Sequence, residues 1–152
     1  LDYFSKEEIE KNKKNWFSNN EFSISAIRKS SFEIYNTIQI SFKTKDKRIL
    51  IQGIEATIVQ DIKKCDKTLN EVDVEFSKMF KNTTREDKNT FKHSYDKSGK
   101  STITDINFIF DSKDEATIAC YDWSTKMEFN DHFRISLRTK KFSYFLSNKA
   151  YK

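Results

Sequence analysis

The chain has 152 residues, of which 36% are hydrophobic and 34% charged, and its formal net charge at pH 7 is +5. This length suffices for a packed core, and no proline- or glycine-rich stretch separates two parts, so we expect a single domain over residues 1–152. No run approaches the roughly 18 consecutive apolar residues of a membrane-spanning helix, so we predict no membrane span. The 14 Phe, 6 Tyr and 2 Trp residues supply a large apolar area and favour a folded chain over a disordered one.

The first expected element is a helix from about Lys6 to Trp16. Ser5 and Glu8 have the spacing of a capping box, in which the two side chains satisfy each other's backbone donors at a helix start. Apolar residues are few in this segment, so the helix should be amphipathic and packed by one edge. A partner-binding helix is the alternative.

Three strands are expected next. Apolar residues alternate with polar ones from Phe22 to Ala26, then from Glu33 to Lys43, and the third strand runs from Arg48 to Val59. Gly53 lies inside the third strand, which predicts a β-bulge or a close approach of another part of the chain to the backbone.

After these strands the apolar period changes from two to about 3.6. This change predicts a helix from about Lys67 to Lys81 that packs across the sheet. Its apolar stripe consists of Leu69, Val72, Phe76, Met79 and Phe80.

Residues Asn82 to Lys100 are polar and show no period. A structureless loop of this length is uncommon inside a compact domain, so this segment is our first candidate for a functional surface. The alternative is an extended segment that crosses one end of the sheet and is held down by Phe91 and Tyr95.

Three successive strands are expected from Ser101 to Leu137, because apolar residues recur at every second position. In the second of them Ile118 and Cys120 share one face, and Tyr121 and Trp123 share the other. Such a strand is covered on both faces, or it carries an aromatic surface on one. In the third strand the expected inward residues are Phe133, Ile135 and Leu137, and the outward ones are Arg134, Ser136 and Arg138.

A short helix from about Lys140 to Asn148 should end the fold, with Thr139 as its N-terminal cap. The elements together predict an α+β fold. It should contain a mainly antiparallel sheet of about five or six strands, an N-terminal helix, one central helix packed on the sheet and a short C-terminal helix.

Two cysteines, Cys65 and Cys120, lie just before the central helix and in the middle strand. If that helix lies on the sheet, the pair comes within the distance of a disulfide, which is usual in exported proteins. A start at Leu1 instead of Met also fits a processed exported chain, and trimming of a tag fits equally. We therefore expect a periplasmic or secreted protein; a cytoplasmic protein with two buried thiols is the alternative.

Sequence motifs for cofactors are incomplete. Ser98–Thr102 resembles the end of a phosphate-binding loop, but the required earlier glycine is Ser94 and a strand follows in place of a helix. The possible metal ligands Cys65, His93, Cys120 and His132 lack the short pair spacings of zinc sites. We expect neither a cofactor nor a metal.

Three classes of function remain. The leading one is a small secreted or periplasmic binding protein, possibly inhibitor-like, whose partner is an unknown protein or small molecule. The second is an enzyme with a non-local site around His93, Asp122 and His132. The third, a nucleic-acid-binding module with a basic stripe at Arg134, Arg138, Lys140 and Lys141, is the least expected because acidic residues accompany the lysines. The candidate binding residues are His93, Tyr95, Asp122, Trp123, His132 and Arg134.

Overall fold

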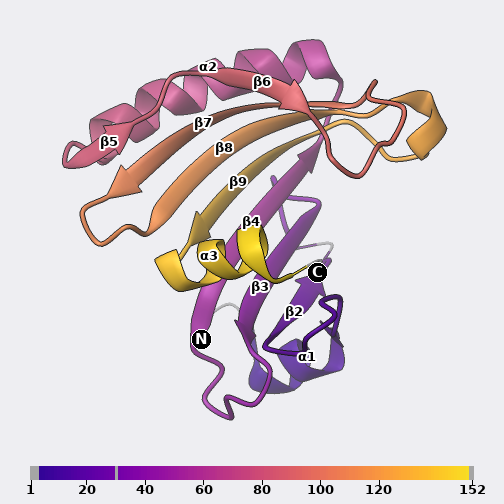
Figure 1. Cartoon of the computed structure of the whole chain (residues 1–152), viewed down its shortest axis with the longest axis vertical. Helices are drawn as coiled ribbons and strands as arrows, with labels where there is room; N and C mark the ends of the chain where they lie inside the picture. Colours follow the sequence, from indigo (N-terminus) through magenta and orange to yellow (C-terminus); the bar gives the residue numbers. More distant parts are fainter. Residues whose placement is uncertain (1–3, 30, 151–152) are drawn as a thin grey trace.

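A computed structural model describes residues 4–29 and 31–150. In these residues nine strands form one antiparallel sheet, in the order β1-β2-β3-β4-β9-β8-β7-β5, and β6 also pairs with β7 (Figure 1). The strands are β1 (Lys13–Lys14), β2 (Phe22–Ile27), β3 (Thr37–Lys43), β4 (Ile51–Val59), β5 (Thr83–Arg85), β6 (Asn89–Lys92), β7 (Thr102–Phe110), β8 (Glu115–Asp122) and β9 (His132–Arg138). The helices are α1 (Lys6–Lys11), α2 (Ile62–Met79), α3 (Lys140–Asn148) and a short 3-10 turn, η1 (Thr125–Met127).

The α+β class and the antiparallel sheet are confirmed, but the predicted five or six strands were too few. The three additional strands are β1, β5 and β6, which are two to four residues long. They lie at or near the edges of the sheet. A strand there pairs with only one neighbour, and its sequence need not alternate between apolar and polar residues.

The central helix α2 covers one face of the half of the sheet formed by β7, β8 and β9 (Figure 1). It begins at Ile62, earlier than the predicted Lys67, because Asp61 caps it by accepting a hydrogen bond from the Lys64 amide at 3.0 Å. The fully buried members of this core are Cys65, Leu69, Ile106, Phe108, Ala116, Ile118, Cys120 and Phe133.

The disulfide between Cys65 and Cys120 is present, with the two Cα atoms 5.8 Å apart. The sequence predicted Cys65 just before the central helix, but in the structure it lies within the first turns of α2. The bond therefore fastens the start of α2 to the middle of β8.

Helix α1 covers the other end of the same sheet face. Its predicted capping box is confirmed, since Ser5 Oγ accepts the Glu8 amide hydrogen at 3.1 Å and the Glu8 carboxylate accepts that of Ser5. The helix ends at Lys11, however, and the predicted extension to Trp16 was wrong because the chain turns into β1. Ile9 is the fully buried residue that holds α1 to the sheet.

Helix α3 packs on the opposite face, and its predicted bounds and Thr139 cap are confirmed. Phe142 and Phe145 contact Phe22 at ring-centroid distances of 5.1 and 4.7 Å. Gly53 permits this packing, because a Cβ atom there would lie 2.8 Å from Phe142 Cδ1. The pairing of β3 with β4 also shifts opposite Gly53, so the predicted bulge and close approach are both confirmed.

The first half of the segment 82–100 is extended, as in the alternative prediction, and is not a structureless loop. Phe91 and Tyr95 do not hold it down, since they are 41% and 66% exposed. Strands β5 and β6 pair side by side with the outer edge of β7. A loop of residues 93–101 remains and lies at one end of the sheet (Figure 1). In the described part of the chain, no helix is both long and apolar enough to cross a membrane.

Candidate functional site

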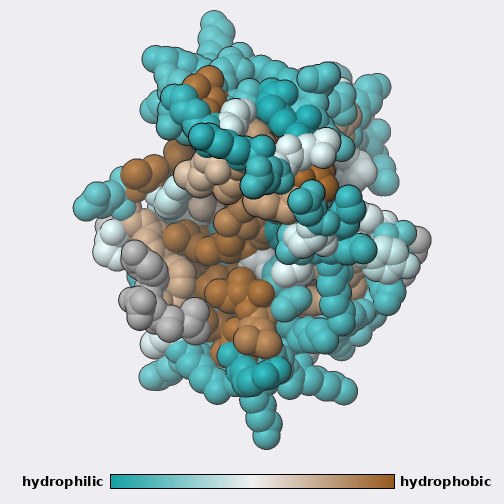
Figure 2. Space-filling model, turned by 90° about the vertical axis from the view of Figure 1, so that its left-hand side faces the viewer, coloured by the Kyte–Doolittle hydropathy of each residue, from teal (hydrophilic) through white to brown (hydrophobic). Residues whose placement is uncertain are grey.

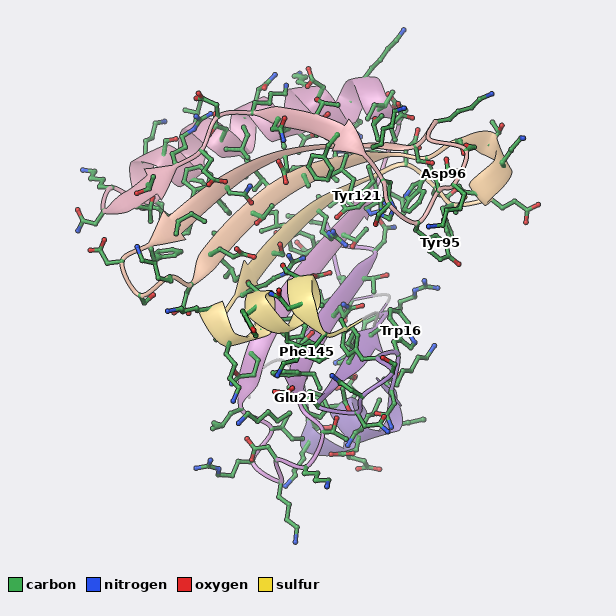
Figure 3. All side chains as sticks on the ribbon, in the orientation of Figure 1. Trp16, Glu21, Tyr95, Asp96, Tyr121 and Phe145 are labelled. Atoms are coloured by element: carbon green, nitrogen blue, oxygen red, sulfur yellow. A yellow bond between two sulfur atoms is a disulfide. The ribbon has the colours of Figure 1, made fainter. Side chains whose placement is uncertain are left out.

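A groove of about 720 Å³ lies on the α3 face of the sheet. Its floor consists of Gln39, Glu55, Arg134 and Arg138, which belong to β3, β4 and β9. The walls come from segments far apart in the sequence: Trp16 and Phe17 on one side, Phe142 and Leu146 of α3, and the loop residues His93, Ser94, Tyr95 and Lys97. Figure 3 shows Trp16 and Tyr95 on separate parts of the chain with a gap between them.

Strand register places the charged floor. Glu55 pairs with Ser136, and the residues two positions along β9 on either side are Arg134 and Arg138. Because alternate residues of a strand face the same side, all four side chains point to the α3 face. Ser136 is small and buried, so the two guanidinium groups can converge on the carboxylate.

Glu55 is the centre of a buried ion-pair cluster. Its Oε1 atom accepts hydrogen bonds from Arg138 Nη2 at 2.6 Å and Nε at 3.2 Å, and Arg134 Nη1 donates to Oε2 at 3.4 Å. Burial alone raises the pKa of Glu55, but the two guanidinium groups outweigh it and hold this pKa below its ordinary value. Glu55 therefore remains charged at neutral pH, with only 9% of its surface exposed.

An aromatic group that we call the Tyr121 cluster borders this floor. It consists of Tyr121, His93, Trp123, His132 and Arg134. The His132 ring stacks on Tyr121 at a centroid distance of 4.6 Å, and the Arg134 guanidinium lies 4.1 Å from the Tyr121 centroid. The His93 ring lies 4.4 Å from that of Trp123. Contact between cation and ring fixes the position of Arg134 at the floor.

The loop that carries His93 and Tyr95 is held by Asp96. This carboxylate accepts hydrogen bonds from the Ser98 amide at 2.8 Å, from the Ser101 hydroxyl at 2.6 Å and from the Ser124 hydroxyl at 2.8 Å. These hydrogen bonds, with that of Ser101 the strongest, lower the pKa of Asp96 well below its usual range. Asp96 thus joins the loop to β7 and to the segment after β8, which gives the groove wall a fixed position.

The structure brings together five of the six candidate binding residues. His93, Trp123, His132 and Arg134 belong to the Tyr121 cluster, and Tyr95 lies at the groove rim. Asp122 does not join them, because strand alternation directs it to the opposite face of β8 from Tyr121. Its pKa is raised by burial and by the neighbouring Asp131.

Two of the proposed arrangements are not found. Among the described residues, no hydrogen bond joins any two of His93, Asp122 and His132, so these residues form no linked catalytic group. In the described part of the chain the predicted basic stripe is also not formed, because Arg134 and Arg138 pair with the Glu55 carboxylate on the groove floor. The side chains of β9 alternate as predicted, but the two faces were partly misassigned: Ser136, predicted outward, is buried on the α3 face, and Leu137, predicted inward, is 42% exposed.

Sequence reasoning missed Glu55, Asp96 and Trp16 as parts of the site. Glu55 could have been noted as the one charged residue inside the β4 segment Ile51–Val59. Asp96 lies in a Ser-rich turn with Gly99 at φ 67°, which resembles any polar corner. Nothing in the sequence indicates that Trp16 faces the groove.

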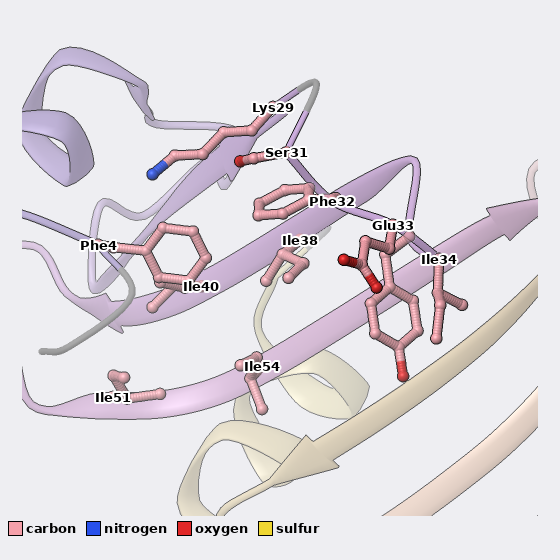
Figure 4. A pocket seen from close by; sticks show the side chains of 11 residues that line it. Phe4, Lys29, Ser31, Phe32, Glu33, Ile34, Ile38, Ile40, Ile51 and Ile54 are labelled. Atoms are coloured by element: carbon pink, nitrogen blue, oxygen red, sulfur yellow. The ribbon is translucent and has the colours of Figure 1, made fainter.

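A second groove lies on the opposite face, between the parts covered by α1 and α2. Its volume is about 770 Å³, and its lining is mainly isoleucine and phenylalanine, including Phe4, Phe32, Ile38, Ile40 and Ile54 (Figure 4). Apolar side chains also gather in a hollow at mid-height in Figure 2. Its polar lining residues are Lys29, Ser31, Glu33 and Tyr35, so this groove offers fewer directional contacts than the first one.

In the residues that the structure describes, no group of three or more His, Cys, Asp or Glu side chains could hold a metal ion. No protein-family model matches the chain, and no curated protein or solved structure is significantly similar to it. The groove's own chemistry is therefore the basis for a functional proposal.

The two histidines predict how stability depends on pH. Burial lowers the pKa of His93 and of His132, and the nearby Arg134 lowers that of His93 further. The unfolded chain therefore binds more protons than the folded one below about pH 6.5, so stability rises with pH through this window and is lost on acidification. We expect a lower melting temperature at about pH 5 than at about pH 7.5.

The measurement is a series of calorimetric melting curves across that range. These two histidines are the only ones in the chain, so a His93→Asn/His132→Asn variant provides the control. Its melting temperature should change less between the two pH values than that of the natural protein. If the melting temperature changed equally in both proteins, the two histidines would not be the cause of the pH dependence.

Proposed function

We propose that this protein is an exported binding protein that holds a small ligand in the groove on the α3 face. The observation that carries the proposal is the combination of a charged, pre-positioned floor with large aromatic rings left exposed at the rim. Trp16 is 57% exposed and Tyr95 is 66% exposed, although each ring would gain by burial. A concave site with a few convergent polar groups and apolar walls is the usual form of a ligand pocket.

Export is supported by the Cys65–Cys120 disulfide, because such bonds persist in the periplasm and outside the cell and are rare in the cytosol. The groove also has the size of pockets that enclose small molecules, about 300–1,000 Å³.

Ligand-observed NMR with a library of small sugars, amino acids and organic acids tests the proposal. Binding compounds are expected for the natural protein. A Ser94→Trp variant, in which an exposed groove residue becomes a large ring, should lose them. Ser77→Trp, on the exposed side of α2, is the matched control and should retain them. Binding that survives Ser94→Trp, or no binding at all, would contradict the proposal.

A further inference from the structure

The charged residues of the groove indicate which ligand chemistry it accepts. Three cationic side chains line it, Lys97, Arg134 and Arg138, against the single carboxylate of Glu55. His93 is neutral at pH 7 because burial lowers its pKa, so it adds no charge at that pH. The lining is therefore net positive, and a negatively charged group gains by entering it.

The two guanidinium groups are fixed before any ligand arrives. Arg138 is held by Glu55 at 2.6 Å, and Arg134 by the Tyr121 ring at 4.1 Å. Nε and Nη2 of Arg138 and Nη1 of Arg134 already donate to Glu55, so the ligand anion binds the guanidinium N–H groups that Glu55 does not engage. Such N–H groups match the oxygens of a carboxylate or a phosphate. Because these side chains are already ordered, binding an anion costs little additional conformational entropy.

Next to the charged floor the groove offers rings and aliphatic carbon. Trp16 and Tyr95 stand at its rim, and Phe142 and Leu146 of α3 line its wall. An exposed indole or phenol prefers to stack against another flat, apolar surface. The apolar wall and the charged floor lie in the same groove, so one small molecule can contact both.

We propose that the groove binds a small molecule that carries one carboxylate or phosphate group on a flat ring, with the anion at Arg134 and Arg138 and the ring between Trp16 and Tyr95. This inference rests on the proposed binding function and specifies its ligand. Arg134 and Arg138 are binding residues in this assignment, and Glu55 positions them.

Three compounds with the same ring test the inference on the full chain: 4-nitrobenzoate, 4-nitrophenyl phosphate and the neutral 4-nitrobenzamide. The chain has two tryptophans, so its NMR spectrum contains two indole N–H signals, which a Trp16→Phe variant assigns. We expect both anions to shift the Trp16 signal and to bind at least about tenfold more tightly than the amide. The ranking of the two anions distinguishes a carboxylate ligand from a phosphate ligand.

Charge variants separate the anion contact from the ring contact. Arg134→Gln should weaken anion binding about tenfold or more and leave the amide unchanged. Arg48→Gln removes the same charge from a side chain that is 78% exposed and outside the groove, and it should change neither. If Arg134→Gln does not fold, Lys97→Gln at an exposed groove position replaces it and should weaken the anions selectively.

Ring variants complete the test. Trp16→Ala should weaken all three compounds, whereas Tyr144→Ala, an equally exposed ring on α3 outside the groove, should not. Equal affinity for the amide and the anions at the Trp16 signal would overturn the anionic ligand and leave the binding function standing. Binding of none of the compounds overturns the anionic ring ligand; the binding function itself fails only if the library screen is also negative.

Discussion

Removal of the Cys65–Cys120 disulfide is expected to lower the melting temperature by roughly 8–16 °C. The bond joins residues 55 positions apart, and on the chain-entropy model closing such a loop stabilises the fold by about 4 kcal/mol. That is a large share of the 5–15 kcal/mol of a typical domain. The prediction is measured on a Cys65→Ala/Cys120→Ala variant by calorimetry.

Reduced natural protein is the control, because it lacks the bond but keeps both buried sulfur atoms in the core. The reduced protein and the double variant should both melt well below the oxidised form, and their difference gives the packing contribution of the sulfur atoms. Alkylation of two thiols in natural protein unfolded without reductant would defeat the prediction. It would also remove the main support for export.

Glu55→Gln is expected to destabilise the protein by about 3 kcal/mol. The substitution keeps the shape of the side chain but leaves Arg134 and Arg138 without their shared carboxylate, and breaking a buried ion pair costs about 3–5 kcal/mol. We expect the lower end of this range, because the two arginine side chains are 26% and 17% exposed and water can partly solvate them. Denaturant unfolding of both proteins provides the measurement.

The matched control is Glu115→Gln, which removes a carboxylate that lies 3.7 Å from Arg138 at the border of the same cluster. Its effect should be clearly smaller. The pKa of Glu55 lies below its ordinary value, so its contribution is present above about pH 4.5 and is lost as the pH falls through the folded pKa. The stability difference between Glu55→Gln and natural protein should therefore shrink in acid, and a difference that grows would contradict the assignment.

Elements with strong local signals were predicted well. The bounds of α3 follow from Thr139, whose hydroxyl accepts the Phe142 amide hydrogen at 3.3 Å, and from an apolar face spaced for a helix. Strands β7, β8 and β9 were identified from the period-two spacing of apolar residues in the sequence. In β7 the buried residues Ile106 and Phe108 follow this period, whereas in β8 Ala119, Cys120 and Tyr121 are buried in succession. The disulfide followed from placing α2 on that sheet.

Elements that depend on distant partners were predicted poorly. Strand β1 exists because Lys13 and Lys14 pair with β2, although Trp16 and Phe17 beyond it gave the segment a helical apolar spacing. Strand β6 has only exposed side chains, so nothing but its pairing with β7 makes it a strand. Local propensity cannot reveal such pairing.

The candidate site was predicted in part, because Trp123 and His132 lie near the ends of β8 and β9 and because His93 and Tyr95 lie in the polar segment already singled out as a candidate surface. Its charged centre was not, since Glu55 and Arg138 are 83 positions apart. The register of β4 with β9 brings them together, and α3 makes their face an interior one. Alternation shows which residues share a face of the sheet, but only the packed fold shows whether that face is exposed to solvent.

The outermost strands of the sheet also limit how molecules of this protein can associate. At one edge β1 is only two lysines long, and at the other β5 and β6 divide the border of β7 into two short, charged segments. A neighbouring molecule would need a long, flat and uncharged strand edge on which to add its own strand, as occurs in amyloid growth. The described outer strands β1, β5 and β6 are all short, so we expect little strand addition by neighbouring molecules even though the groove exposes aromatic rings.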